Sequence, residues 1–176
     1  RLVTVSATAH AKVNLHLGVH AQRDERGYHR VDSLMAPVAL YDTVVVEDAP
    51  EPAVSFSPAL SVPVERSGVS LAVARLADAL GERPCVRVAV TRRVPGSAGL
   101  GSSSTDAGAV LRALALRWGV DPLDERVCAV ARSIGADVPF FLSPRAVLYA
   151  GAGDVLERAL VDFKGGAGLR TCMCVP

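Results

Sequence analysis

The sequence predicts an α+β fold, and three observations support this prediction. Alternating apolar and polar residues near the N-terminus indicate strands, since side chains of a strand point to opposite faces in turn. A later stretch has the 3.6-residue periodicity of a helix that buries one face. Strands come first and are then mixed with helices, which favours α+β over a regular βαβ alternation.

Composition limits the classes of protein that fit. The 176 residues suit one domain, or one large domain with a short annex, and 50% are hydrophobic with only 5% aromatic. The core is therefore built mainly from Ala, Val and Leu. A net charge of +1 with dispersed arginines argues against a nucleic-acid partner. No segment approaches the length of a membrane helix, and four cysteines without a CxxC pair suit a reducing cytoplasm, so we expect a cytoplasmic protein.

The N-terminal third is expected to consist of strands and loops. Residues 12–19 alternate, with one apolar face and one polar face that bears Lys12 and Asn14. A bend at Tyr41-Asp42 is expected to separate two further strands, and four prolines make residues 49–66 a surface excursion. The expected strands span residues 3–9, 12–19, 34–40 and 43–47, with a polar loop at 22–30.

Helices become frequent after residue 68. Residues 69–80 form an amphipathic pattern that Gly81 ends. A strand over residues 85–94 leads into a glycine-rich turn and then a helix from about Ser102 to Trp118. Asp121 before Pro122 predicts the cap of a further helix that runs to Ile134. Residues 146–150 and 169–176 are the remaining candidate strands.

The turn Pro-Gly-Ser-Ala-Gly-Leu-Gly-Ser-Ser-Ser-Thr, residues 95–105, has the chemistry of a phosphate site. Gly99 and Gly101 allow close backbone approach, and the helix that follows offers free N–H groups and a partial positive charge. The turn lacks the Gly-Lys-Ser/Thr ending of a Walker A loop and the GxGxxG of a Rossmann fold. An ordinary strand-to-helix turn is the alternative interpretation.

This turn resembles the second motif of the GHMP kinases, which include galactokinase, homoserine kinase and mevalonate kinase. The resemblance implies an N-terminal domain like ribosomal protein S5 domain 2, with ATP as phosphate donor and Mg²⁺ bound with it. No fixed metal site is expected, although Ser102 to Ser104 could reach the ion. The residues implied to bind ATP are Pro95, Gly96, Ser97, Ala98, Gly99, Leu100, Gly101, Ser102, Ser103, Ser104 and Thr105.

Two N-terminal segments, Ala-Lys-Val-Asn-Leu at residues 11–15 and Gly-Tyr-His at 27–29, narrow the resemblance. They are similar to the branch of the family that phosphorylates 4-diphosphocytidyl-2-C-methyl-D-erythritol (CDP-methylerythritol), although Arg26 stands where that branch usually has Asp. The resemblance implies that Lys12 is catalytic and that Asn14 lines the substrate pocket. Tyr28 would stack on the cytosine and His29 would hydrogen-bond to it. A solvent-exposed strand and a loop-anchoring pair are the alternatives.

The segment Gly-Ala-Asp-Val-Pro, residues 135–139, matches the part of these kinases that carries the catalytic aspartate. The resemblance therefore makes Asp137 the candidate base and substrate contact, with a capping or turn aspartate as the alternative. Phosphoryl transfer depends mainly on positioning and charge neutralisation, so Asp137 would orient or accept the hydroxyl proton while Lys12 steadies the γ-phosphate. His10, His16 and His20 are too spread along a strand to form one metal site.

The resemblance covers about residues 5–160, so we expect an ATP-binding domain over 1–160 and the beginning of a linker or second domain over 161–176. The predicted function is ATP-dependent phosphorylation of a hydroxyl of CDP-methylerythritol, a small-molecule substrate of isoprenoid precursor synthesis, by a monomer or homodimer. The turn reads Gly-Leu-Gly-Ser-Ser-Ser where that branch usually has Gly-Leu-Gly-Gly-Gly-Ser-Ser. Another GHMP kinase, a non-catalytic nucleotide-binding module and an RNA-binding or scaffold module of the S5 type therefore remain alternatives.

Overall fold

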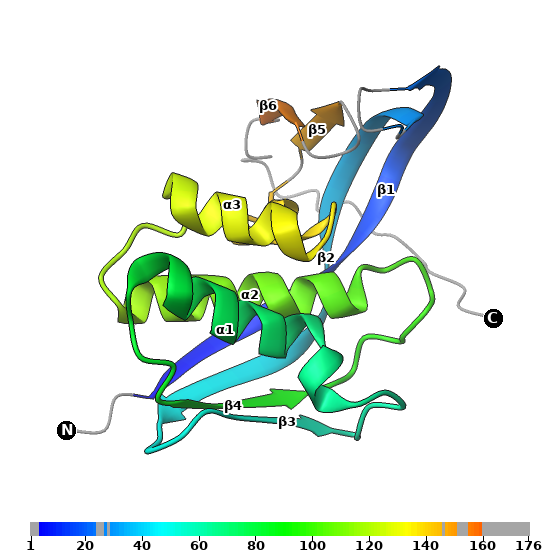
Figure 1. The fold of residues 1–176 in the computed structure, drawn as a ribbon. Coiled ribbons are helices and arrows are strands. Elements are labelled where there is room, and N and C mark those ends of the chain that lie inside the picture. The colour runs from blue at the N-terminus through cyan, green and yellow to red at the C-terminus, as the bar shows by residue number, and fades with distance from the viewer. Residues whose placement is uncertain (1–3, 24–26, 28, 146, 151–154, 160–176) are drawn as a thin grey trace, which may run out of the picture.

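The computed structural model describes residues 4–23, 27, 29–145, 147–150 and 155–159. Within them, six strands form one sheet, helices α1 and α2 cover one face of it, and α3 packs on these two helices (Figure 1). The α+β prediction is confirmed. None of the described helices is both long and apolar enough to cross a membrane.

A long hairpin of β1 and β2 organises the sheet. Strand β1 runs along one edge of β2, while β4 and β5 pair with separate halves of the opposite edge. The order is β3-β4-β2-β5-β6, with β1 beside β2 and with β3 parallel to β4. The strands are β1 (Val5–Arg23), β2 (His29–Asp48), β3 (Ala53–Ser57), β4 (Val86–Thr91), β5 (Val147–Ala150) and β6 (Val155–Ala159).

The helices begin and end at residues suited to those positions. Helix α1 (Gly68–Leu80) is capped by Ser67, whose hydroxyl accepts from Ser70 N–H, and ends at left-handed Gly81 as predicted. Helix α2 (Ser102–Arg117) begins directly after the glycine-rich turn, also as predicted. Short 3-10 helices η1 (Val64–Arg66) and η2 (Val138–Leu142) lie before α1 and after α3.

Helix α3 (Glu125–Ile134) begins later than the sequence suggested. Its cap is Asp124, whose carboxylate accepts from Arg126 N–H, and the Asp121-Pro122 prediction was wrong. The Asp121 carboxylate instead accepts from Leu123 N–H in a turn before the helix. Both aspartates accept a hydrogen bond from the backbone N–H two residues later, and only Asp124 stands at the N-terminus of the helix.

Two further predictions were wrong. Tyr41-Asp42 is not a bend, because β2 continues through it from His29 to Asp48. The excursion over residues 49–66 contains β3, which gains its partner from β4, more than 30 residues later in the chain. Predicted strand 169–176 and the expected domain boundary at residue 160 lie outside the described residues.

The core lies between the sheet and the helices and is made of small side chains. Val44, Val46 and Val88 from the sheet meet Ala107 and Leu111 of α2, all fully or almost fully buried. The far part of the hairpin extends past the helices (Figure 1). Its apolar side chains Leu15, Leu17 and Val19 are therefore exposed among the described residues.

Candidate functional site

The glycine-rich turn joins β4 to α2, and its glycines are required by its geometry. Gly99 and Gly101 have φ of 70° and 77°, in the left-handed region. A Cβ at Gly101 would lie 2.8 Å from Phe141 Cζ and 3.2 Å from Lys12 Cγ. Gly101 has no side chain to cap α2, so the first N–H groups of the helix remain for a ligand. An anion could bind there.

Lys12 and Asp137 meet beside this turn. Lys12 is only 6% exposed, and its Nζ lies 3.4 Å from Asp137 Oδ2. The Lys12 backbone N–H donates to Leu100 O at 3.0 Å, so β1 is joined directly to the turn. A buried lysine needs a charged or polar partner to offset its lost hydration. Asp137 and Asn14 supply this, which holds the ammonium at one place.

Asn14 extends the polar network along β1. Lys12 Nζ donates to Asn14 Oδ1 at 2.5 Å, and Asn14 Nδ2 donates to Ser33 Oγ of β2 at 2.7 Å. Lys12 and Asn14 share one strand face, as predicted, because side chains two residues apart point the same way. Ser33 was not predicted from the sequence, and the hairpin register places it opposite Leu17 and within reach of Asn14.

Phe141 anchors the aspartate segment under the turn. Asp137 immediately precedes η2, whose Phe140 and Phe141 are buried with Met35 of β2, the two rings 4.9 Å apart and edge to face. Gly108 of α2 lets this segment approach, since a Cβ there would lie 2.4 Å from Phe141 Cβ. Gly108 was not predicted as part of the site, although a glycine inside a helix signals close packing.

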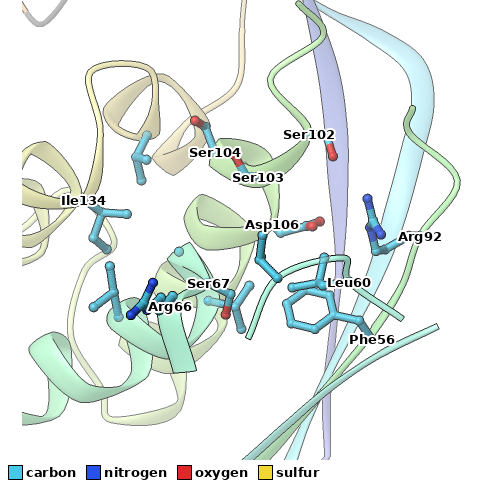
Figure 2. A pocket seen from close by; sticks show the side chains of 15 residues that line it. Phe56, Leu60, Arg66, Ser67, Arg92, Ser102, Ser103, Ser104, Asp106 and Ile134 are labelled. Atoms are coloured by element: carbon cyan, nitrogen blue, oxygen red, sulfur yellow. The ribbon is translucent and has the colours of Figure 1, made fainter. Parts of the chain in front are cut away.

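A pocket of about 300 Å³ lies beside the first turn of α2. Phe56 and Leu60 form part of an apolar wall, and Arg92 and Asp106 add polar groups (Figure 2). Ser102, Ser103 and Ser104, at the start of α2, also line the pocket. This wall was not predicted, because Phe56 belongs to β3, which lies in the proline-rich segment that was expected to be a surface excursion.

The structure does not bring His29 to the Lys12–Asp137 pair. His29 begins β2 opposite Arg23, eleven positions along β1 from Lys12, and its ring Nδ1 lies 2.9 Å from His20 O. Register shifts in the hairpin interrupt the strand between the two places. Tyr28 lies outside the described residues. The turn, Lys12, Asn14 and Asp137 thus form one group, and His29 lies apart.

The residues that could hold a metal ion are few. Among the residues described, no three His, Cys, Asp or Glu side chains gather into a metal-binding group. The three serine hydroxyls at the start of α2 lie beside the pocket. Oxygen ligands of this kind suit Mg²⁺ when phosphate oxygens and water supply the rest of the coordination shell.

Comparison with known proteins gives one consistent result. Residues 67–145 match the family "GHMP kinases N terminal domain". The chain is 41% identical over 151 residues to 4-diphosphocytidyl-2-C-methyl-D-erythritol kinase of Salinibacter ruber, covering 85% of this chain and 52% of that relative. It is 38% identical over 168 residues to the kinase of the same name from Treponema pallidum strain Nichols, covering 94% and 57%. The chain thus spans about half the length of the curated relatives it matches.

Solved structures agree with these relatives. A crystal structure of 4-(cytidine 5'-diphospho)-2C-methyl-D-erythritol kinase superposes with a TM-score of 0.73 at 36% identity, covering 89% of this chain and 55% of that one. Mevalonate kinase of Methanococcus jannaschii superposes with a TM-score of 0.61 at 14% identity, covering 92% and 56%. The second likeness shows the fold alone.

Proposed function

Because the chain belongs to the GHMP kinases, whose N-terminal domain it carries, we propose that it phosphorylates a hydroxyl group of 4-diphosphocytidyl-2-C-methyl-D-erythritol with ATP. The observation that carries the proposal is the Lys12–Asp137 contact of 3.4 Å beside the glycine-rich turn. The substrate is proposed from the names of the relatives and from the Lys12-to-Asn14 and Gly27-to-His29 segments. Residues 1–160 are proposed as the ATP-binding domain.

ATP is proposed to lie along the turn. Its phosphates would accept hydrogen bonds from backbone N–H groups at the start of α2, where the helix dipole favours negative charge. The nucleoside end fits the neighbouring pocket, since Phe56 and Leu60 offer the apolar surface that an aromatic base needs. Mg²⁺ would come with ATP, near the hydroxyls of Ser102 to Ser104, and would neutralise charge on the phosphates.

Lys12 and Asp137 are proposed to act on the transferred group and the attacking hydroxyl. The Asp137 carboxylate, with a side chain that is 39% exposed, can accept a hydrogen bond from an incoming hydroxyl while Lys12 remains buried behind it. The Lys12 ammonium would stabilise negative charge on the phosphoryl group as it moves. Asn14 keeps Lys12 oriented and offers its amide to the substrate.

The end of the hairpin is proposed to recognise the cytosine. A nucleoside diphosphate ester is a long molecule, so its base is bound away from the hydroxyl that reacts. Tyr28 and His29 have the stacking surface and the hydrogen-bonding edge that a pyrimidine requires. Another GHMP kinase is the second candidate, favoured by the three serines of the turn.

The experiment that separates these candidates measures ADP release by the purified chain with Mg-ATP. CDP-methylerythritol, homoserine and mevalonate are each added in turn. Stimulation by CDP-methylerythritol alone supports the proposed substrate. Stimulation by homoserine or mevalonate instead would assign the chain to another branch of the same family.

A further inference from the structure

Two buried aspartates lie beneath the turn and have no part in the proposed chemistry. Asp42 of β2 is fully buried, and Asp106 of α2 is 3% exposed. Their carboxyl groups lie in hydrogen-bonding contact. Two acidic groups side by side in a protein interior repel each other when both are ionised. The two carboxyl groups can therefore lie side by side only if an interaction offsets this repulsion or one of them is neutral.

Asp42 holds the entrance of the turn. Its Oδ1 accepts from the backbone N–H of Val94 at 2.7 Å and from that of Arg93 in a very short contact. These residues directly precede Pro95, where the turn begins. A carboxylate that accepts two backbone N–H groups fixes the direction of the chain. Asp42 thus determines where the turn leaves the sheet.

Asp106 holds the exit of the turn. It lies in the first turn and a half of α2, four residues after Ser102, and it lines the pocket beside the serines (Figure 2). Its neighbour Thr105 donates from Oγ1 to His10 O at 2.7 Å, so this part of α2 is also joined to β1. A link from Asp106 to Asp42 therefore connects the residues on either side of the turn.

One shared hydrogen accounts for the atoms that lack partners. Asp42 Oδ2 and Asp106 Oδ1 are buried, and no donor contacts either atom among the residues described. Each such oxygen costs free energy unless it is bonded. A hydrogen on one carboxyl group, donated to the other, satisfies both oxygens and removes one of the two charges.

The surroundings favour this hydrogen. Burial, and then the Asp42 charge, raise the pKa of Asp106 to about 8, so that Asp106 holds a proton at neutral pH. Arg92, which follows β4, acts weakly in the opposite direction. Arg66 of η1 also lines the pocket. Asp42 on β2 is the acidic group in contact with Asp106.

We propose that Asp42 and Asp106 are positioning residues that close the base of the nucleotide turn, holding its entrance and exit together through one shared hydrogen. Only the expected effect on ATP affinity rests on the proposed function. The geometry of the turn itself can be tested without ATP. Neither aspartate touches the reacting atoms, so both act through the backbone of the turn.

The test compares Asp106→Asn with Asp106→Leu in the full 176-residue chain. The two new side chains have similar size, but only the amide can donate a hydrogen bond to Asp42. Asp42→Ala removes the acceptor for Arg93 and Val94. Asp78→Asn, at an exposed position of α1, is the control for loss of a negative charge. Circular dichroism first establishes that each variant is folded.

Two readouts are then taken. Hydrogen exchange measures the protection of the amides of Arg93 and Val94 without nucleotide, and a fluorescent ATP analogue with Mg²⁺ measures affinity. We expect Asp106→Leu and Asp42→Ala each to lower the amide protection and the affinity for the ATP analogue by roughly tenfold or more. In Asp106→Asn, both quantities should stay close to those of the unchanged chain. Asp78→Asn should match the unchanged chain.

Three outcomes would be decisive. A folded Asp106→Leu variant with unchanged amide protection would overturn the inference, because the turn would then not need the pair. Equal losses in the Asn and Leu variants would also overturn it, since the carboxylate charge itself would then be required. If the unchanged chain binds no ATP analogue, the proposed function fails, while the amide protection still decides whether the pair closes the turn.

Discussion

The Lys12 ammonium lies 3.4 Å from the Asp137 carboxylate, although one residue comes from strand β1 and the other from the segment after helix α3. The contact forms because β1 bonds to the turn through Lys12 N–H and Leu100 O, while Phe141 fixes the Asp137 segment beneath Gly101. The fold thus places a cation and a carboxylate next to a helix start that can bind phosphate.

Removing either member of this pair should stop turnover but leave ATP bound. We expect Lys12→Ala and Asp137→Asn each to lower kcat by on the order of 10²-fold to 10⁴-fold. Affinity for an ATP analogue should change by less than about fivefold, since the turn supplies most of its contacts. Turnover is measured by ADP release and affinity by fluorescence titration.

Lys12→Arg sharpens this test. A guanidinium is larger, planar and always charged, so it cannot occupy the buried place of the Lys12 ammonium between Asn14 and Asp137. We expect Lys12→Arg to have little more activity than Lys12→Ala. Full activity in Lys12→Arg, or in Asp137→Asn, would contradict the roles given to the pair.

Gly101→Ala should damage the turn far more than Gly99→Ala. Both glycines have positive φ, which costs an alanine roughly 1 kcal/mol or more. Only at Gly101 would the new methyl also collide with the Phe141 ring and the Lys12 side chain. Overpacking of this kind adds roughly 1–3 kcal/mol.

Urea denaturation of the two glycine variants measures the difference. Gly99→Ala is the matched control, because its added Cβ meets no atom within 4 Å. We expect the free energy of unfolding to fall clearly more for Gly101→Ala than for Gly99→Ala. Equal losses would show that the contact between the turn, Phe141 and Lys12 is not tight.

The stability of the protein should depend on pH through Asp106. Its pKa is raised from 3.8 to about 8, so between these values the folded chain keeps a proton that the unfolded chain has lost. Folding therefore binds a proton in this window, and the free energy of unfolding falls as pH rises, by at most about 1.4 kcal/mol per pH unit. Below pH 3.8 and above pH 8 this contribution is constant.

Asp106→Asn removes the titrating group but retains its size. Its free energy of unfolding should therefore fall less steeply than that of the unchanged chain from pH 5 to pH 8, and the variant should be the more stable of the two at pH 8. Urea denaturation at each pH unit gives both curves. Parallel curves would mean that Asp106 does not carry the proton.

His29→Ala should weaken substrate binding without affecting ATP. Loss of one hydrogen bond to a base corresponds to about 1 kcal/mol, or roughly a fivefold rise in KM for CDP-methylerythritol. His16→Ala is the control, since His16 is another exposed histidine of the same hairpin. A rise in KM that is equal for the two variants would argue against recognition of cytosine by His29.

Local chemistry predicted the end of α1 and the start of α2, but it chose Asp121 where Asp124 is the cap of α3. Gly81 ends α1, and the glycine-serine turn leads into α2, because left-handed glycines and free helix N–H groups act within a few residues. The Lys12, Asn14 and Asp137 positions were expected from a family resemblance. Spacing placed Lys12 and Asn14 on one strand face, but it could not place Asp137 beside them, since that contact depends on how β1 and η2 pack against α2.

The bend expected at Asp42 and the missed strand β3 share a long-range cause. Asp42 was expected in a bend, but β2 continues through it because its backbone pairs with β1, and its carboxylate accepts backbone N–H groups of Arg93 and Val94, about 50 residues away in the chain. Strand β3 was not predicted in the proline-rich segment, because it is a strand only through its pairing with β4. Phe56, and with it the wall of the pocket, was missed for that reason.

The most direct test of the whole account follows the γ-phosphate of radiolabelled ATP. The chain is incubated with labelled Mg-ATP and CDP-methylerythritol, and the products are separated. The account predicts that label enters CDP-methylerythritol with the unchanged chain and not with Asp137→Asn. Label that enters homoserine or mevalonate instead, or that enters CDP-methylerythritol equally well with Asp137→Asn, would contradict it.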